Sequence, residues 1–284
     1  MGIIVGLDIG GSTTKIVGLQ DGVLMSRELV QASDPIASAF GALGKFINQH
    51  QLSLDAISHV MVTGVGASYL QGNLLGIPTQ RTPEFEAIGL GGLYVSGLSD
   101  AVVVSMGTGT AIVQASRDGV RHLIGSGVGG GTLLGLSSRM IHIRDFQTFK
   151  DIAEKGDLHH IDLAIGDISS DEIPGLSPDT TASSFGKMTD TASHADIALG
   201  IVNLVFQSVG TAAVLAARLT DVRQVVFTGN LTLVSSGKRV LDSFASLYDI
   251  AILVPEGAEF ATAIGAALCC PRLANPASAE GRAI

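Results

Sequence analysis

One segment of the sequence combines residues that can bind phosphate and a metal ion. In DIGGSTTK, residues 8–15, Asp8 ends an apolar stretch and precedes two glycines, three hydroxyl side chains and Lys15. Successive N–H groups at such a turn form a concavity for anionic oxygens. A carboxylate beside phosphate repels it unless Mg²⁺ lies between them. The segment therefore predicts a phosphate site, although an ordinary hairpin capped by Asp8 is the alternative.

Three further glycine-rich turns could serve the same chemistry. GTGT at 107–110 could hold phosphate from the opposite side, and TGN at 228–230 ends an apolar strand. GSGVGGG at 125–131 opens a helix, whose first N–H groups favour an anion, unless these glycines serve only close packing. The joint occurrence of these turns is a more specific sign of phosphate binding than any single turn. Neither a Walker loop nor a dinucleotide fingerprint is present.

The elements that position these turns occur twice. Strands are expected at residues 3–8, 15–19 and 23–29, and again at 101–105, 111–116 and 120–124. Each set contains a small-residue turn and then an Asp-Gly hairpin signal. The repeat, about 100 residues apart, indicates an internal duplication. Helices are expected near residues 35–50, 84–97, 131–140, 197–217, 232–245 and 260–268, with strands at 59–63, 225–228 and 250–254.

Composition narrows the class of protein. The 284 residues include 17 basic and 26 acidic side chains, a net charge of −9, which argues against nucleic acid or an anionic membrane as partner. The 36 glycines accompany 46% hydrophobic residues, too many for a disordered chain. The only cysteines, Cys269 and Cys270, are adjacent, and the N-terminus has no signal-peptide pattern, so we expect a cytoplasmic protein. The apolar segment 197–217 contains Asn203 and Gln207, which favours a buried or interface helix over a membrane span.

With these turns in place, the sequence resembles the actin-like ATPases and sugar kinases, and among them most closely the type II pantothenate kinases. The segments that carry the resemblance occur in family order over nearly the whole chain: PEFEA (83–87), SMGTGTAI (105–112), GSGVGGGTLLGL (125–136), AEKGD (153–157), ASSFGKM (182–188), VVFTGN (225–230) and EFATAIGAAL (259–268).

The resemblance implies an α/β fold of two duplicated ribonuclease-H-like domains, the actin-like ATPase fold, with a nucleotide cleft between residues 1–98 and residues 99–284. It implies a kinase that uses ATP and Mg²⁺ to phosphorylate the primary hydroxyl of pantothenate, giving 4′-phosphopantothenate, the first step of coenzyme A biosynthesis. It also implies a homodimer joined through helix 197–217.

The resemblance assigns roles to individual residues. Glu84 matches the catalytic base, with Glu86 as runner-up. A carboxylate beside Phe85 at an apolar helix start is suited to a raised pKa, although the helix dipole alone also favours acids there. Asp8 would hold the metal ion. The other implied ligand-binding residues are the triphosphate contacts Gly10, Gly11, Ser12, Thr13, Thr14, Lys15 and Thr108, the nucleotide loop Gly130, Gly131, Thr132, Leu133 and Leu134, and the adenosine contacts Phe146 and Asn230. Phe146 as a plain core residue is the alternative.

The sequence departs from the family at one point. The family places an arginine shortly before the glycine-rich helix, where it contacts the substrate or the charge of the transition state. Here VRHLIGSGVGGG puts His122 in that place and Arg121 one residue away. A one-residue shift in a strand reverses the face of a side chain. Either a small insertion restores Arg121, or His122 replaces the arginine and the substrate differs.

Two other functions fit parts of the sequence. DIGGSTTK and VTGVGASYL (62–70) also resemble the ATPases that activate 2-hydroxyacyl-CoA dehydratases, which share an iron–sulfur cluster across a dimer through mid-chain cysteines. This sequence has no cysteine before Cys269, so we expect no iron. A kinase of a related small alcohol and a non-catalytic nucleotide sensor are the remaining alternatives. The presence of Asp8, Lys15 and Glu84 together argues against the sensor.

Overall fold

The computed structural model describes residues 2–11, 13–31, 34–171 and 173–271, and contains two five-stranded sheets with the same strand order. The first sheet consists of β1 (Ile3–Ile9), β2 (Thr13–Gln20), β3 (Val23–Gln31), β4 (Ile57–Thr63) and β5 (Thr79–Arg81), in the order β3-β2-β1-β4-β5. The second consists of β6 (Asp100–Met106), β7 (Thr110–Ser116), β8 (Gly119–Ser126), β11 (Gln224–Thr228) and β12 (Ala251–Leu253), in the order β8-β7-β6-β11-β12. In each, three antiparallel strands are joined by two parallel ones, which confirms the predicted duplication.

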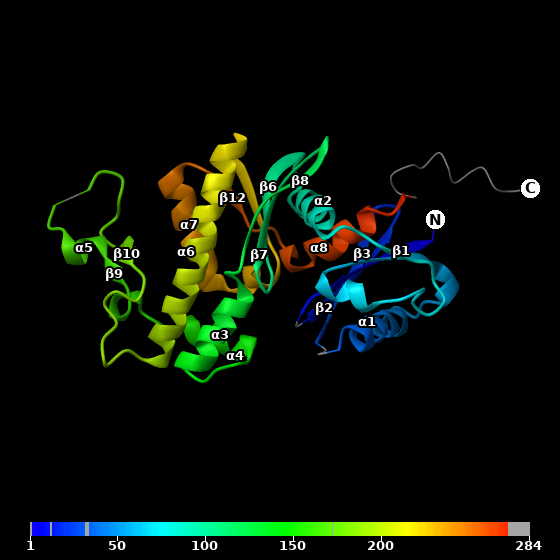
Figure 1. Cartoon of the computed structure of the whole chain (residues 1–284), viewed down its shortest axis with the longest axis horizontal. Helices are drawn as coiled ribbons and strands as arrows, with labels where there is room; N and C mark the ends of the chain where they lie inside the picture. Colours follow the sequence, from blue (N-terminus) through cyan, green and yellow to red (C-terminus); the bar gives the residue numbers. More distant parts are fainter. Residues whose placement is uncertain (1, 12, 32–33, 172, 272–284) are drawn as a thin grey trace, which may run out of the picture.

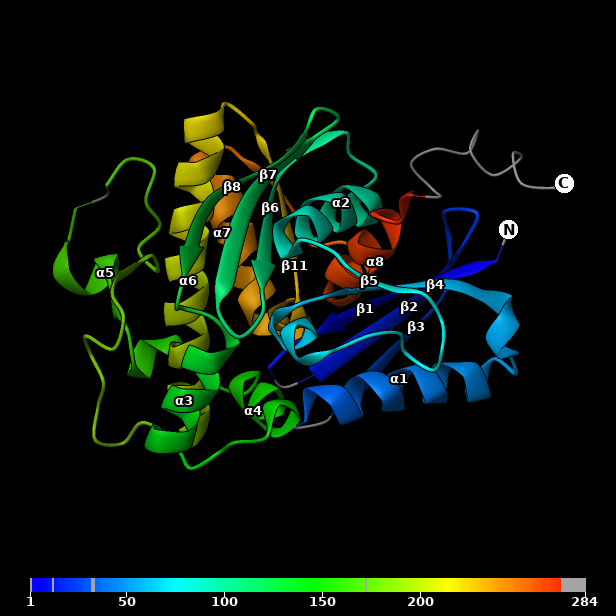
Figure 2. The same cartoon turned by 45° about the vertical axis from the view of Figure 1, so that its right-hand side comes forward.

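The outer faces of the two sheets are covered by helices from their own part of the chain. Helix α1 (Pro35–Gln49) packs Leu43 and Phe46 onto the first sheet. Helices α6 (His194–Thr220) and α7 (Ser235–Tyr248) cover the second sheet. Figures 1 and 2 show the resulting layers, with α1 at one side and α6 at the other.

Between the sheets lie two helices, one of which, the later in the sequence, packs on the sheet more distant in the sequence. Helix α2 (Glu84–Ser96) follows β5 but packs Ile88 onto the second sheet, against Val103. Helix α8 (Ala261–Leu268), near the end of the described chain, packs Ala263 and Ile264 onto the first sheet. Figure 2 shows α2 and α8 side by side between the sheets. The division at residue 98 stays a prediction, since these two helices join the two halves.

Backbone contact at this crossing depends on two glycines. A Cβ added to Gly91 would lie 1.8 Å from the carbonyl oxygen of Ala261, and one added to Gly265 would lie 1.8 Å from that of Ala87. No heavier residue fits at either position without moving a helix. The small residues of α8 thus allow the two helix backbones to pack in contact.

Short elements connect the second sheet to α6. They are α3 (Gly130–Met140), α4 (Phe146–Ala153), β9 (Leu163–Ala164), α5 (Ile165–Ile168) and β10 (Thr181–Ser183). The 3₁₀ turns of the chain are η1 (Leu54–Ala56), η2 (Val65–Tyr69), η3 (Leu158–His160), η4 (Asn230–Leu233) and η5 (Ala258–Phe260). Asp162, which is buried, accepts hydrogen bonds from Asn203 of α6 at 2.6 Å and from the backbone of Phe185 at 2.9 Å. These bonds attach the segment to α6.

Among the described residues, α6 is the one helix that is long and apolar enough to cross a membrane. It lies instead mostly inside the protein, with Asn203 and Asp196 buried in hydrogen bonds. The structure therefore agrees with the expectation of a buried helix rather than a span.

The start of α6 is fixed by Asp196. Its carboxylate accepts hydrogen bonds from the backbone of Asp157 at 2.8 Å and of Ser193 at 2.9 Å, and lies 3.2 Å from Nδ1 of His160. Burial alone would raise the pKa of this carboxyl, but the hydrogen bonds outweigh burial and lower it to about 2. The ionised form is therefore favoured in the folded protein.

We expect Asp196→Ala to lower the free energy of unfolding by about 1–2 kcal/mol at pH 7, because a helix cap is lost. Since the pKa is lowered on folding, the stabilisation is present above the ordinary value of 3.8 and is lost as the pH falls towards about 2. Urea denaturation at pH 7, 4 and 3 measures the difference. Asp242→Ala, which removes only an exposed pair with Lys238, is the control. An equal deficit at all three pH values would contradict the assignment.

Candidate active site

Asp8 and Lys15 lie opposite each other beside the β1–β2 turn. They are partners in the antiparallel register, and Nζ of Lys15 lies 3.5 Å from Oδ2 of Asp8. By the alternation of the strands, both side chains share the sheet face on which Ile4 and Val17 contact α8, so they face the space between the sheets. The structure thus brings the predicted metal ligand and the predicted cation together.

Thr14 and Ser12 differ from the other predicted phosphate contacts of this turn. Thr14 points to the other face of the sheet, where its buried hydroxyl accepts a hydrogen bond from Ser38 of α1. The Thr14 hydroxyl therefore faces away from the predicted phosphate site, because a strand turns successive side chains to opposite faces, and a phosphate contact by Thr14 through its backbone stays a prediction. Ser12 lies outside the described residues. Thr13 alternates with Thr14 and so shares the face of Lys15.

The second turn, between β6 and β7, lies next to the first. A Cβ added to Gly11 would be 3.6 Å from Oγ1 of Thr108. About 100 residues separate these positions in the sequence. The fold therefore places the two predicted phosphate turns face to face.

The glycines that open α3 pack against this second turn. The N–H of Gly130 donates to the carbonyl of Gly107 at 2.9 Å, and that of Gly131 donates to Thr108 at 2.8 Å. A Cβ on Gly130 would lie 2.9 Å from the carbonyl oxygen of Gly107. These two N–H groups are thus occupied, and the close-packing alternative accounts for the glycines. The side chain of Leu133 is fully buried in the core of the second half, so a nucleotide contact at this residue, which stays a prediction, would have to use its backbone.

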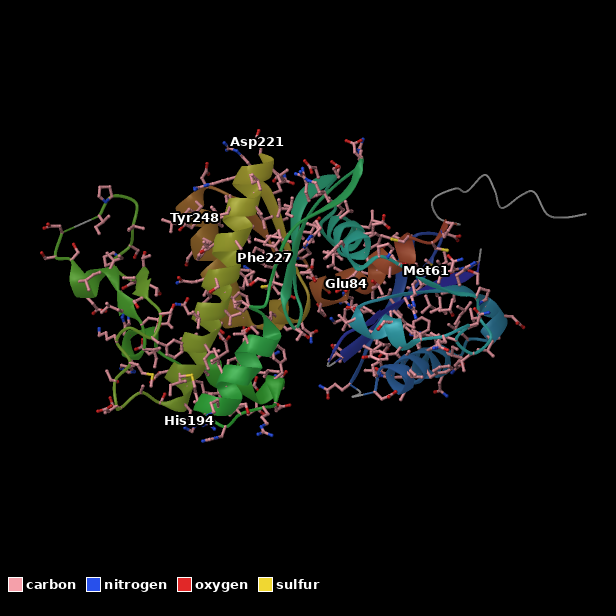
Figure 3. All side chains as sticks on the ribbon, viewed as in Figure 1. Met61, Glu84, His194, Asp221, Phe227 and Tyr248 are labelled. Atoms are coloured by element: carbon pink, nitrogen blue, oxygen red, sulfur yellow. The ribbon has the colours of Figure 1, made fainter. Side chains whose placement is uncertain are left out.

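Glu84 begins α2 and remains reachable from solvent. The surrounding protein, which removes water from the carboxylate, and secondly the negative charge of Asp8 raise the pKa of Glu84 above its ordinary value of 4.5. Figure 3 shows Glu84 between the half that holds Met61 and the half that holds Phe227. A carboxylate with a raised pKa beside a phosphate turn is suited to accept a proton.

Glu86 lies in a different environment. Burial, and then the charge of Glu86, raise the pKa of the Cys269 thiol to about 11. Glu86 thus faces the end of α8, whereas Glu84 faces Asp8. The structure therefore favours Glu84 over Glu86 as the base.

Thr82, which the sequence did not single out, lies two residues before Glu84. It is 7% exposed, and its buried Oγ1 finds no hydrogen-bond partner among the described residues, although its backbone N–H donates to Val62 and its carbonyl accepts from Thr63. Only the structure shows a buried hydroxyl without a partner, and no sequence pattern marks it.

Arg121 and His122 point to opposite faces of β8. Arg121 is paired with Gln114 in the register and donates to its Oε1 at 2.9 Å. His122 is paired with Val113, on the face that α2 covers, and its ring stacks on Phe85 with centroids 4.0 Å apart and planes at 15°. On the face of β8 that α2 covers, it is therefore His122, and not Arg121, that contacts the start of α2, through Phe85.

The ends of β4 and β11 repeat one backbone arrangement. Gly64 after β4 has φ 86°, and an added Cβ would lie 2.6 Å from the carbonyl oxygen of Ile9. Gly229 after β11 has φ 90°, and an added Cβ would lie 2.5 Å from that of Met106. Glycine is required at both positions, because no other residue combines this φ with such close contact. The duplication therefore extends to the parallel strands.

Asn230 follows Gly229, and its buried Oδ1 has no hydrogen-bond partner in the part of the chain that the structure describes. An unpaired buried acceptor fits a ligand that donates an N–H or O–H group. Phe146 begins α4, partly buried against the core, with Nζ of Lys150 5.7 Å from the centre of its ring. Only part of the Phe146 ring is therefore available to stack on an adenine base.

The residues present fit a magnesium ion bound mainly by the nucleotide. Within the described ranges no group of three or more histidine, cysteine, aspartate or glutamate side chains could hold a metal. Mg²⁺ needs no such group, because one or two carboxylates and substrate phosphates suffice, and Asp8 supplies one carboxylate at the turn.

A cavity of about 260 Å³ lies beside the first turn, on the side of α1. Its lining residues come from the turn, α1 and η2: Gly10, Gly11, Pro35, Ser38, Val65, Gly66, Ser68 and Tyr69. It was not predicted, because its lining combines segments that are distant in the sequence.

Solved structures of low sequence identity share this fold. The activator of the 2-hydroxyisocaproyl-CoA dehydratase from Clostridium difficile, with bound ADPNP, has a TM-score of 0.71 at 20% identity, covering 99% of both chains. A ROK family glucokinase from Streptomyces griseus, in complex with glucose and AMPPNP, has a TM-score of 0.58 at 14% identity, covering 94% of this chain and 98% of the other. These likenesses confirm the predicted two-domain actin-like fold.

Relatives in sequence identify the family of this chain more specifically than the shared fold does. The family model described as Fumble matches residues 98–246, more than half of the chain. The type II pantothenate kinase of Staphylococcus aureus (strain USA300) is 30% identical over 277 residues, which cover 92% of this chain and 97% of the relative. The resemblance noted from the motifs is thereby confirmed, and this chain belongs to the type II pantothenate kinase family.

Proposed function

We propose that this protein transfers the γ-phosphoryl group of ATP to the primary hydroxyl of pantothenate, giving 4′-phosphopantothenate for coenzyme A biosynthesis. The observation that carries the proposal is the position of Glu84. Its pKa is raised, it lies at the space between the sheets, and Asp8, Lys15 and the two facing glycine turns lie on the same side. Family membership supplies the substrate.

In this proposal Glu84 takes the proton of the attacking hydroxyl as its oxygen bonds to the γ-phosphorus. The bond from that phosphorus to the oxygen bridging to the β-phosphate breaks, and ADP leaves. Lys15 neutralises charge on the phosphates, and the backbone of the turn that holds Gly10 and Gly11 approaches them without side-chain bulk. Thr13 and Thr108 offer hydroxyls from the two turns. When bound, Mg²⁺ held by Asp8 would neutralise further charge on the phosphates. Phosphoryl transfer depends mainly on such positioning and neutralisation.

The adenosine would lie in the second half of the protein. We assign Phe146 to the base and Asn230 to a donor group of the adenosine. Gly130, Gly131, Thr132 and Leu134 would contact the nucleotide through surfaces other than the two N–H groups that the second turn already engages.

We further propose a cytoplasmic homodimer that associates through α6. Its outward side carries Ser208, Thr211, Leu215 and Leu219, and the two leucines are 60% and 80% exposed. A row of small and apolar side chains along a helix suits contact with a second copy.

An assay of ADP release with added pantothenate tests the function. Turnover with pantothenate or pantetheine supports it. ATP binding without turnover on either compound contradicts it. Turnover with another small alcohol, or stimulation of a dehydratase, would instead support one of the alternative activities.

We expect Asn230→Leu to weaken binding of a non-hydrolysable ATP analogue about tenfold and to stabilise the ligand-free protein by about 1 kcal/mol. Both effects follow from removal of a buried acceptor that only the ligand satisfies. Calorimetric binding and urea denaturation measure them. Ser236→Ala, which removes a buried hydroxyl of α7 that has no hydrogen-bond partner among the described residues, is the control and should change stability alone. Unchanged affinity in Asn230→Leu would refute the adenosine assignment.

A further inference from the structure

Two hydrogen bonds attach the chain just before α2 to the end of β4. The N–H of Thr82 donates to the carbonyl of Val62 at 2.8 Å, and Oγ1 of Thr63 donates to the carbonyl of Thr82 at 3.1 Å. Thr63 is only 1% exposed, so water does not compete for this second bond. The last two residues of β4 therefore hold the backbone of Thr82 at both its N–H and its carbonyl.

The same strand end lies beside Asp8. Thr63 is the partner of Asp8 in the parallel register of β1 and β4, and a Cβ added to Gly64 would lie 2.7 Å from Oδ1 of Asp8. Thr63 lies two residues after Met61, which packs with α8, so its side chain shares the sheet face of Asp8. Thr63 thus adjoins Asp8 and, through its hydroxyl, contacts the chain that leads to Glu84.

A single proline separates the held residue, Thr82, from Glu84. The ring of Pro83 fixes its own φ, which is −56°, and restricts the backbone of the residue before it. Proline also has no side-chain group that could cap α2. The orientation of the Thr82 peptide group therefore largely sets where Glu84 begins the helix.

This attachment matters because α2 packs on the other sheet. Ile88 of α2 packs against Val103 of the second sheet, whereas Asp8 belongs to the first, and Figure 2 shows α2 lying between the two. Packing alone would let the start of α2 follow the second sheet. Burial and then the charge of Asp8 raise the pKa of Glu84, which agrees with a carboxylate kept near the first sheet.

The duplicated half provides an internal comparison. Thr228 ends β11 before Gly229, as Thr63 ends β4 before Gly64, and it is 0% exposed. Its hydroxyl donates to the carbonyl of Val104 in the neighbouring strand β6, at 3.4 Å. The equivalent threonine of the second half thus binds within its own sheet, whereas that of the first half binds the chain before the proposed base.

We propose that Thr63 is a positioning residue, whose hydroxyl holds the Thr82 peptide group so that Glu84 stays beside Asp8 while the rest of α2 packs on the second sheet. The inference rests on the proposed function and deepens it. Thr63 is buried and acts through Glu84, without a contact to the reactants. Its effect belongs to alignment of the base with the attacking hydroxyl, and therefore to kcat rather than to nucleotide affinity.

Thr63→Val removes the hydroxyl at nearly unchanged size. We expect kcat with pantothenate to fall about tenfold, because a displaced base is poorly aligned, while a non-hydrolysable ATP analogue binds with affinity within a fewfold of wild type. Thr63→Ser keeps the donor and should retain kcat to within about twofold. Thr63→Ala also lacks the hydroxyl, so it should match Thr63→Val, and it replaces that variant if valine prevents folding.

Thr228→Val is the matched control. It makes the same substitution at the equivalent buried position, where the hydroxyl binds within the second sheet. It should lower stability towards urea as Thr63→Val does, because each leaves a buried carbonyl without its donor. At saturating ATP its kcat should stay within about twofold of wild type.

Combining Thr63→Val with Glu84→Gln separates positioning of the base from general weakening of the site. If Thr63 acts through Glu84, the double variant has the same residual kcat as Glu84→Gln alone. A further loss of kcat in the double variant, or equal kcat in Thr63→Val and Thr228→Val, would overturn the inference and leave the proposed function standing. Absence of wild-type turnover on pantothenate would instead contradict the proposed function, on which the inference rests.

Discussion

Glu84→Gln is expected to lower kcat about 1,000-fold while binding of ATP persists. Glutamine keeps the size of the side chain but cannot take up the proton of the attacking hydroxyl. The nucleotide contacts lie on other elements, so a non-hydrolysable ATP analogue should bind to the variant with an affinity within a fewfold of that of wild type. Full activity in the variant would refute the assignment of the base.

The pH dependence gives an independent check on the same residue. Because the pKa of Glu84 is raised in the folded protein, the base becomes protonated as the pH falls through a value above 4.5. We therefore expect kcat/KM of the wild type to decline on the acid side through this raised pKa, and the residual activity of Glu84→Gln to lack that step.

Glu86→Gln is the matched control for Glu84→Gln. It changes the same residue type two positions along α2, where the charge acts on Cys269 rather than beside Asp8. We expect nearly wild-type kcat and a faster reaction of Cys269 with thiol reagents, because loss of the negative charge lowers the pKa of that thiol. A large loss of kcat in Glu86→Gln alone would reverse the two assignments.

Gly265→Ala is expected to destabilise the protein by several kcal/mol, among the largest effects available to a single methyl group. The added Cβ would lie 1.8 Å from the carbonyl oxygen of Ala87 and 2.7 Å from the backbone nitrogen of Gly91. Neither neighbour is a flexible side chain, so α2 and α8 must separate, and Glu84 at the start of α2 must move with them. Urea denaturation and kcat measure the two consequences.

Gly44→Ala provides the control for the glycine itself. Gly44 lies inside α1 on its exposed side, and an added Cβ would have no neighbour within 4 Å. Alanine there should stabilise the protein by about 0.5–1 kcal/mol, since glycine is a poor helix former. A loss of stability in Gly44→Ala equal to that in Gly265→Ala would contradict the role of the helix crossing.

Much of the fold could be predicted because its signals are local. The hairpin at Asp21 and Gly22 has positive φ at both residues, as the Asp-Gly pair indicated, and the helical spacing of apolar residues between positions 36 and 47 marks α1 to within a few residues. The three residues of β5 and the two of β9 are too short to show any period. They form because neighbouring backbone offers hydrogen-bond partners, which is information that a single segment does not contain.

The site was predicted at the level of turns but not of side chains. Lys15 and Thr14 are adjacent in the sequence, yet one faces the space between the sheets and the other faces α1. The same one-residue difference separates His122 from Arg121, and it depends on the register of β8 against β7, which includes a bulge. Spacing alone also could not show whether the N–H groups of Gly130 and Gly131 face a ligand or the next turn.

The position of α8 constrains the order in which the protein can fold during its synthesis. Ribosomes deliver the first sheet within its first 81 residues, but the helix that covers its inner face ends at Leu268. During synthesis, the apolar side chains of Ile4, Val17 and Met61 therefore stay uncovered until α8 has been made. Nascent N-terminal fragments that lack α8 should bind chaperones and resist separate production, and the two halves should mature as one cooperative unit only after α8 has been made.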